Sequence, residues 1–236
     1  MRVDETRRIV ELPDSISFSR HANPARYSVP DNPLSKKYHS ITEKGVKQAH
    51  MTVRKELIPA LEETPLGTVL FILAKSDQTR TGHTADAYGD EFDRIAQSRD
   101  DLLVLTKTKL SVQRGNTRRT IKETIKGMLV LENGTNITGP LPEKVAREYI
   151  EGIMRIFHFV KKQVPNRPIR IHGVGHQLDL DAVVTFLATG KVDTLSFIQV
   201  TGGTAIKESE LITDITFSLN GRITVKYRGK EFKRRG

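Results

Sequence analysis

The feature of this chain that most constrains its fold is an alternation between short apolar runs and longer segments with helical periodicity. Five runs have the length and composition of buried or half-buried strands: 15–19, 68–73, 102–106, 168–172 and 194–200. The segments between them predict helices at 42–63, 80–96, 143–162 and 179–188. Because strands that alternate with helices are typical of the α/β class, we expect a three-layer α/β/α sandwich with a mostly parallel central sheet.

The helical periodicity is clearest between residues 143 and 162. Seven apolar side chains share one face there: Val145, Tyr149, Ile150, Ile153, Met154, Phe157 and Val160. A helix with one apolar face packs against a sheet, which supports the layered architecture. In the segment 42–63, Thr42 is a suitable N-cap, and Pro59 is expected to kink or end the helix because proline has no N–H to donate.

The C-terminal part of the chain has a different pattern, in which two alternating runs flank Asn220-Gly221. An Asn-Gly pair in this setting predicts a β-hairpin, so we expect an antiparallel hairpin at about 211–228, added at an edge of the sheet. We interpret Gly202-Gly203 as a turn before this hairpin, and the basic tail 230–236 as a solvated end. Since we find no internal repeat and no low-complexity linker, we expect a single domain over residues 1–236.

The composition excludes some classes of chemistry and leaves others open. The 236 residues include 38 Lys and Arg against 28 Asp and Glu, which gives a formal net charge of +10. The chain has no cysteine, which excludes disulfides, thiolate nucleophiles and cysteine-ligated metal sites. The positive charge is compatible with an ordinary solvated surface, and equally with a partner rich in phosphate.

The sequence predicts neither a membrane span nor a secretory route. No run approaches the ~18 apolar residues of a membrane span, and the N-terminal residues lack the apolar core of a signal peptide. We therefore expect a cytoplasmic protein with no membrane partner. Nucleic acid is not the expected partner either, because only 6% of the residues are aromatic and no RNP-like or helix-turn-helix pattern is present.

Cationic and imidazole side chains follow three of the predicted strands at the point where each strand ends. Arg20 and His21 follow the first strand, and Arg80 comes after the second. His172 and His176 lie at the end of the fourth. Because ligands of open α/β sheets bind beyond the carboxyl ends of the strands, we expect two arginines and two or three histidines to converge at one edge.

A cluster of this kind is suited to phosphoryl transfer. Arginine forks match the oxygens of a phosphate group. A neutral imidazole is a nucleophile at pH 7, and a second one can donate to the phosphoryl group. Fixed cations would stabilise the developing charge, so we expect a phosphohistidine intermediate and neither a metal nor an organic cofactor. We interpret His172 as a structural strand residue.

Four segments occur in this order along the chain, and three of them contain residues of this cluster: Ser19–Ala22 (SRHA), Ile41–Ala49 (ITEKGVKQA), Ser76–Ala85 (SDQTRTGHTA) and Gly173–Gln177 (GVGHQ). With them the chain resembles the histidine phosphatase superfamily, which has the phosphoglycerate-mutase-like fold. The resemblance spans roughly residues 15–190.

The resemblance implies a role for each matching residue. His21 corresponds to the nucleophile that becomes phosphorylated, and Arg20 and Arg80 correspond to the arginines that bind phosphate. His176 corresponds to the second histidine of the pocket, which contacts the phosphoryl group.

Two further residues near the first motif are candidates for binding substrate. They are Asn23 and Arg26, and for Arg26 a solvated loop position and a second anion contact both remain open.

The proton donor does not follow the family pattern. One branch of the superfamily has a glutamate after its third strand, but here residues 105–115 contain no Asp or Glu. The other branch has an aspartate directly after the second histidine, where this chain has Gln177. The nearest carboxylates are those of Asp179 and Asp181. The candidates are therefore Asp179, or a loop carboxylate such as Asp90 or Glu91.

The sequence therefore predicts a phosphatase that hydrolyses a phosphate ester through a phosphohistidine on His21. The expected substrate is a phosphorylated small molecule or a phosphoprotein. The alternatives are a non-catalytic phosphate-binding or regulatory protein on the same fold, and a mutase.

Overall fold

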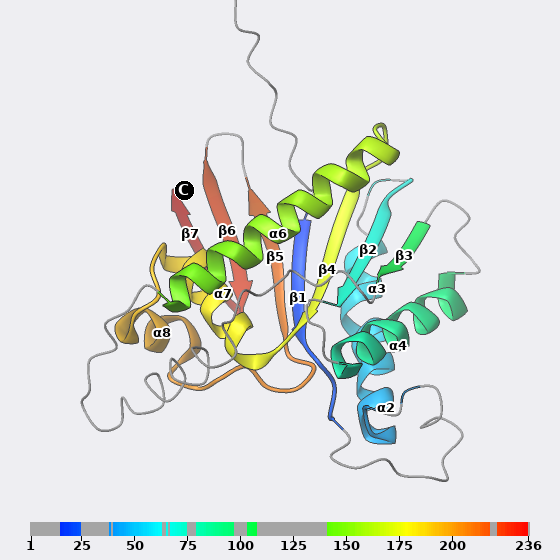
Figure 1. Cartoon of the computed structure of the whole chain (residues 1–236), viewed down its shortest axis with the longest axis horizontal. Helices are drawn as coiled ribbons and strands as arrows, with labels where there is room; N and C mark the ends of the chain where they lie inside the picture. Colours follow the sequence, from blue (N-terminus) through cyan, green and yellow to red (C-terminus); the bar gives the residue numbers. More distant parts are fainter. Residues whose placement is uncertain are drawn as a thin grey trace, which may run out of the picture.

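The computed structural model describes residues 15–24, 38, 40–62, 65, 67–74, 79–96, 103–107, 141–217 and 221–235. In these residues a seven-stranded sheet has the order β3-β2-β4-β1-β5-β6-β7 (Figure 1). Its strands are β1 (Ser15–Arg20), β2 (Val69–Ala74), β3 (Leu103–Lys107), β4 (Ile169–Gly175), β5 (Leu211–Phe217), β6 (Arg222–Tyr227) and β7 (Lys230–Arg235). The first four strands are parallel, and β5 to β7 extend the sheet in antiparallel pairs.

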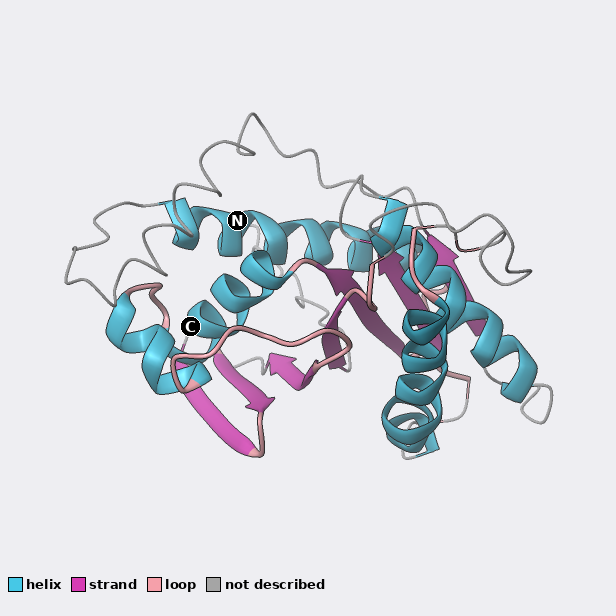
Figure 2. Ribbon diagram, turned by 90° about the horizontal axis from the view of Figure 1, so that it is seen from below, coloured by secondary structure: helices cyan, strands magenta, loops and turns pink. Residues whose placement is uncertain are grey.

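Helices cover both faces of this sheet (Figure 2). They are α2 (Glu43–Thr52), a π-helical turn η1 (Val53–Leu57), α3 (Ile58–Glu62), α4 (Thr79–Ala96), α6 (Leu141–Gln163), α7 (Gln177–Thr189) and α8 (Thr194–Thr201). Residues 80–96, 143–162 and 179–188, which the sequence predicts to be helical, are helical here. The three-layer α/β/α fold class is confirmed.

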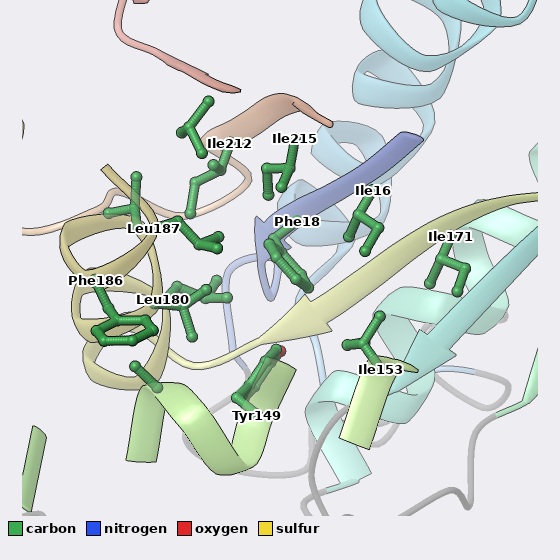
Figure 3. Packing of buried hydrophobic residues seen from close by; sticks show 14 of the residues in the cluster. Ile16, Phe18, Tyr149, Ile153, Ile171, Leu180, Phe186, Leu187, Ile212 and Ile215 are labelled. Carbon is green, nitrogen blue, oxygen red and sulfur yellow. The ribbon is translucent and has the colours of Figure 1, made fainter. Parts of the chain in front are cut away.

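One face of the sheet packs against α6 and α7. Ile16 and Phe18 of β1 point into this core, where the ring of Phe18 meets that of Tyr149 edge-on at 5.4 Å between centroids (Figure 3). Leu180 and Leu187 of α7 complete the contact. Because alternate residues of a strand point to opposite faces, Ser17 and Ser19 of β1 point to the other face of the sheet.

The other face packs against α2, η1 and α4. Leu70 and Ile72 of β2 lie in this second core with Tyr88 and Phe92 of α4. This side also contains a polar cluster, in which the imidazole of His172 lies between the hydroxyl groups of Ser17 and Ser19. The two cores hold β1 and β4 side by side at the centre of the sheet, which fixes where these strands end.

The helix predicted for 42–63 is present as a continuous helical segment that is capped at Thr42 and contains a π-helical turn. Thr42 is its N-cap, and the Thr42 hydroxyl accepts a hydrogen bond from the Gly45 amide at 3.0 Å. Pro59 neither ends nor sharply breaks it. The π-helical turn at 53–57 comes directly before this proline, and the chain then stays helical to Glu62.

The strand predicted for 194–200 is wrong, because these residues form helix α8. The carboxylate of Asp193 accepts a hydrogen bond from the Ser196 amide at 2.8 Å and so caps the first turn. The helix ends at Gly202 in the left-handed conformation, with φ +69. Capping at both ends outweighs the β-branched composition of the run.

The tail, predicted as a solvated end, has mostly exposed side chains, but it forms a strand that the sequence did not predict. Residues 230–235 form β7, which pairs with the whole length of β6. Arg234 anchors this strand, because its Nε donates to the Leu187 carbonyl at 2.8 Å and its guanidinium lies 5.3 Å from the centroid of the Phe186 ring. The predicted hairpin is confirmed as β5 and β6, and the tail adds a third strand to it.

The described residues contain no single helix that is both long and apolar enough to cross a bilayer. Residues 179–189 and 194–201 reach that composition only as a pair bent by 93°.

Candidate functional site

The site is built around His21, the first residue after β1. The His21 amide donates to the Gly175 carbonyl at 3.0 Å, so the pairing of β1 with β4 continues through this residue. The imidazole is 3% exposed, and its Nδ1 donates to the Ala22 carbonyl at 2.8 Å. Since Nδ1 carries the proton in this arrangement, Nε2 of the neutral ring has the free lone pair.

The pKa of His21 is lowered to about 4, and burial is the largest cause. The hydrogen bond to Ala22 opposes this shift, whereas the charges of Arg80 and Arg20 add to it. Both guanidinium groups therefore lie close enough to act on the ring. The imidazole is consequently neutral, and its Nε2 nucleophilic, at pH values well below 7.

His176 lies beside His21 at the end of the neighbouring strand. Their ring centroids are 5.2 Å apart and the rings are inclined by 67°. His176 is the first residue after β4, the N-cap position of α7, and its side chain is largely buried. The two imidazoles, 155 positions apart in the sequence, are thus brought together by the parallel pairing of two strands.

Two guanidinium groups complete the cluster. Arg20 is the last residue of β1 and Arg80 lies in the first turn of α4. Burial and the charge of Arg20 both lower the pKa of Arg80, so the two cations repel each other. The Nε atoms of both arginines are buried and have no hydrogen-bond partner among the described residues. A bound anion would relieve both the repulsion and the unpaired N–H groups.

Thr84 holds the helix that carries Arg80 against the strand end that carries His21. Its hydroxyl donates to the Arg80 carbonyl at 2.8 Å and accepts from the Ala22 amide at 3.1 Å. The side chain is fully buried. Thr84 belongs to the third motif of the sequence, and this double contact explains why a hydroxyl is needed there.

Thr84→Val is expected to lower the free energy of unfolding by about 1–3 kcal/mol, because it leaves the buried Ala22 amide without an acceptor. Urea denaturation near neutral pH measures the change. Thr185→Val is the matched control, since Thr185 is equally buried and also donates to a carbonyl four residues earlier, but its hydroxyl accepts no hydrogen bond from another described segment. Its expected effect is below about 0.5 kcal/mol, and equal effects of the two variants would contradict this role.

Asn23 connects the site to the start of α2. Its carbonyl accepts from the Thr42 amide at 3.0 Å, and its Oδ1 accepts from the Thr42 hydroxyl at 3.1 Å. A Cβ at position 45 would lie 2.6 Å from the same carbonyl, so only glycine fits there. The Thr-Glu-Lys-Gly segment therefore packs a helix end onto the loop after His21. Substrate binding by Asn23 stays a prediction.

The other predicted residues divide into three groups. Arg26 lies outside the described residues. Asp179 is buried in the first turn of α7, where the helix dipole stabilises a negative charge. Its role as proton donor stays a prediction. Asp90 and Glu91 are on helix α4 and not on a loop, which corrects their suggested position.

The environment of Glu91 argues against the role of acid. Its carboxylate accepts from Arg54 and from Arg94, and His50 lies 3.6 Å away. Burial alone would raise the pKa of Glu91, but these partners lower it to about 2. A carboxylate that stays ionised in an ion cluster has no proton to give at neutral pH.

His172 is confirmed as a structural residue. Its Nδ1 lies 2.8 Å from the Ser17 hydroxyl and its Nε2 lies 2.9 Å from the Ser19 hydroxyl. Burial lowers its pKa to about 3, so the ring is neutral. The hydroxyl of Tyr88 also donates to Ser19, at 3.1 Å, and this network lies inside the sheet layers, below the strand ends.

Sequence reasoning missed one charged residue of the site, Glu208. It belongs to the segment between α8 and β5 and lies 3.9 Å from Arg20. Its charge acts on His21. No motif identifies this residue, because it reaches the site through the packing of a loop that lies 187 positions further along the chain.

No protein-family model matches this chain, and no curated protein matches its sequence. Solved structures of similar overall shape include mycobacterial hydrolase 1, with 15% identity and a TM-score of 0.47 over 94% of this chain and 96% of that one. The mycobacterial glucosyl-3-phosphoglycerate phosphatase has 15% identity and a TM-score of 0.45 over 94% and 96%. A phosphoglycerate mutase from Plasmodium falciparum has 14% identity and a TM-score of 0.39 over 93% and 96%.

At these identities the likeness concerns overall shape, and no conclusion about activity is drawn from it. The class that the fold and the site define is an α/β/α protein with two imidazoles and two guanidinium groups at the carboxyl ends of parallel strands. Three of the four motifs through which the chain resembles the histidine phosphatase superfamily carry these groups, and the other, residues 41–49, forms the start of α2.

Proposed function

We propose that this protein is a histidine-type phosphatase of the histidine phosphatase superfamily. His21 attacks the phosphorus of a phosphate ester through Nε2, and the alcohol leaves. Water then attacks the phosphohistidine, which releases inorganic phosphate and restores the imidazole. Arg20, Arg80 and His176 hold the phosphoryl oxygens during both steps.

The observation that carries this proposal is the state of His21. A buried imidazole whose Nδ1 proton is held by the Ala22 carbonyl presents its lone pair at Nε2. Two of the charges that act on it belong to guanidinium groups whose Nε atoms have no partner among the described residues. A nucleophile fixed beside paired cations is what phosphoryl transfer requires, because most of its catalysis is positioning and charge stabilisation.

The substrate is expected to be a phosphorylated small molecule or a phosphoprotein, and the expected location is the cytoplasm. The net charge of +10 favours an anionic substrate. The absence of cysteine is consistent with a reducing compartment.

Trapping the intermediate tests the proposal. The wild-type protein is mixed with p-nitrophenyl phosphate, quenched in alkali within milliseconds, and digested for mass spectrometry. A phosphoryl group that is stable in alkali and lost in acid is expected on the peptide containing residue 21. Turnover without such an adduct would overturn the proposal. Binding of inorganic phosphate with no turnover of any ester would favour the non-catalytic phosphate-binding alternative.

A further inference from the structure

The chemistry at His21 needs a proton donor for the leaving oxygen, and the predicted family positions do not supply one. Among the described residues, Glu208 is a carboxylate that the structure brings to the cluster. Its Oε1 lies 3.9 Å from Nη2 of Arg20, and its Oε2 accepts a hydrogen bond from Nδ2 of Asn23 at 2.9 Å. Its negative charge acts on His21, opposing the two guanidinium groups.

The exposure of Glu208 suits a donor. Its side chain is 29% exposed, whereas Asp179 and Asp181 are each 2% exposed. A leaving group departs on the side opposite the nucleophile, toward the solvent from which the substrate came. The acid must therefore be reachable from solvent, as the partly exposed side chain of Glu208 is.

The segment that carries Glu208, residues 202–210, is held firmly; we refer to it as the 202–210 loop. Both backbone polar groups of Ile206 are hydrogen-bonded, since its amide donates to Asp181 at 2.9 Å and its carbonyl accepts from Nη1 of Arg20 at 3.0 Å. The Ser209 amide donates to the Arg20 carbonyl at 3.2 Å. The loop is thus fastened directly to the residue that precedes the nucleophile.

A second anchor comes from the C-terminal hairpin. The guanidinium of Arg228 donates to groups on both ends of the loop and just before it: the carbonyls of Thr201, Thr204 and Ala205, the Thr204 hydroxyl and the Glu210 carboxylate. The residue after Glu208 has a left-handed backbone, with φ +58 at Ser209. Such a conformation is unfavourable in a non-glycine residue. Fixed geometry of this kind is typical of functional positions.

We propose that Glu208 is the general acid and base of the reaction, an inference that rests on the proposed phosphatase function. In the first step Nε2 of His21 bonds to phosphorus, the ester P–O bond breaks, and the Glu208 carboxyl gives its proton to the leaving oxygen. In the second step the Glu208 carboxylate takes a proton from a water molecule, and the oxygen of that water bonds to phosphorus. The P–N bond then breaks, and its electron pair returns to Nε2.

The two steps need opposite protonation states of the same carboxyl group. The first step needs the protonated form, which gives its proton to the leaving oxygen. Transfer of that proton leaves the carboxylate, which the second step needs. One group therefore serves both steps without an external proton carrier.

Glu208→Gln tests the proposal with two substrates that differ in leaving group. Glycerol 2-phosphate releases a basic alkoxide, and its kcat/KM is expected to fall about 10²–10⁴-fold, the usual contribution of a general acid. p-Nitrophenyl phosphate releases a weakly basic phenolate, so its kcat/KM is expected to change less than about tenfold. Its kcat is expected to fall, with a burst of one p-nitrophenolate per protein, because the phosphoenzyme lacks the base for hydrolysis.

Glu151→Gln is the control, since it makes the same change on α6, in a side chain that is 65% exposed and pairs with Arg155. It is expected to keep the wild-type ratio of the two kcat/KM values. Glu208→Asp keeps a carboxyl group on a side chain that is one methylene shorter. It is expected to restore part of the kcat/KM for glycerol 2-phosphate that Glu208→Gln loses. Such recovery shows that the loss comes from the missing carboxyl group and not from a folding defect.

Equal losses on both substrates, no loss on either, or the selective loss in Asp179→Asn instead would overturn the assignment of Glu208. None of these results touches the proposed function, which fails only if the nucleophile is not His21 or if no ester is hydrolysed. The two failures are therefore distinguishable.

Discussion

His21→Asn is expected to lower kcat/KM for p-nitrophenyl phosphate by at least about 10⁴-fold, because the variant lacks the atom that bonds to phosphorus. Asparagine is a conservative replacement, since its amide can still donate to the Ala22 carbonyl that the imidazole now binds. The fold around the strand end should therefore persist. Initial rates of p-nitrophenolate release between about pH 5.5 and 8 measure the effect, because His21 stays neutral across this range.

The pH dependence of the wild-type protein belongs to the same measurement. Burial and the two neighbouring cations lower the pKa of His21 to about 4. As the pH falls, the nucleophile is protonated only near that value, so protonation of His21 should cost little activity above about pH 5.

His158→Asn is the control for this substitution, because His158 is an exposed histidine on α6. It is expected to keep wild-type rates. Substantial activity in His21→Asn, with an unchanged urea unfolding curve, would assign the nucleophile to another residue and remove the basis of the proposed mechanism.

Arg80→Lys is expected to lower kcat/KM by about 10²–10³-fold, the usual effect of losing one preorganised donor to a developing anion. Lysine keeps the charge but not the planar fork that binds two phosphate oxygens together. Arg80 is chosen over Arg20 because Arg20 also holds the Ile206 carbonyl, so its loss would disturb the 202–210 loop as well. Inhibition by orthovanadate gives a second measurement, and its inhibition constant should rise in parallel.

Arg94→Lys provides the comparison on the same helix. Arg94 lies in α4 with its side chain 60% exposed and pairs with Glu91. Its replacement is expected to leave both kcat/KM and vanadate inhibition unchanged. If Arg80→Lys binds vanadate as the wild type does, the phosphoryl group is held elsewhere.

The central part of the fold was predictable because its signals are local. The run 68–73 is apolar on both faces, and the runs 15–19 and 168–172 alternate apolar and polar residues; the structure has β2, β1 and β4 at these places. Both patterns indicate a strand without reference to its neighbours in the sheet. The observed strands differ from these runs by one to three residues at their ends.

The mispredicted elements are those decided by contacts distant in sequence or by capping. The run 194–200 is rich in β-branched and aromatic residues, but the caps at Asp193 and Gly202 make it helical. The tail 230–235 has few apolar residues to indicate a strand. It forms one because β6 offers a free edge and because Arg234 covers the Phe186 ring.

The same distinction applies to the site. His21 and Arg80 could be found because each lies in a short motif next to a predicted strand or helix end. Their function as binding groups could be suggested because parallel strands end at one edge. Glu208 could not be found in this way. Its position depends on how the loop after α8 returns to β1, and that path is fixed by Ile206, Asp181 and Arg228.

The clamp made by Arg228 has an evolutionary consequence. This arginine sits just past β6, on a part of the sheet that contains none of the four motifs, yet it braces the backbone that presents Glu208. Two descendants of a common ancestor could keep every motif residue and still differ in the leaving groups they accept, because of changes in the strands β6 and β7 and the turn between them. Selection on reactivity would then act on a region that sequence signatures ignore.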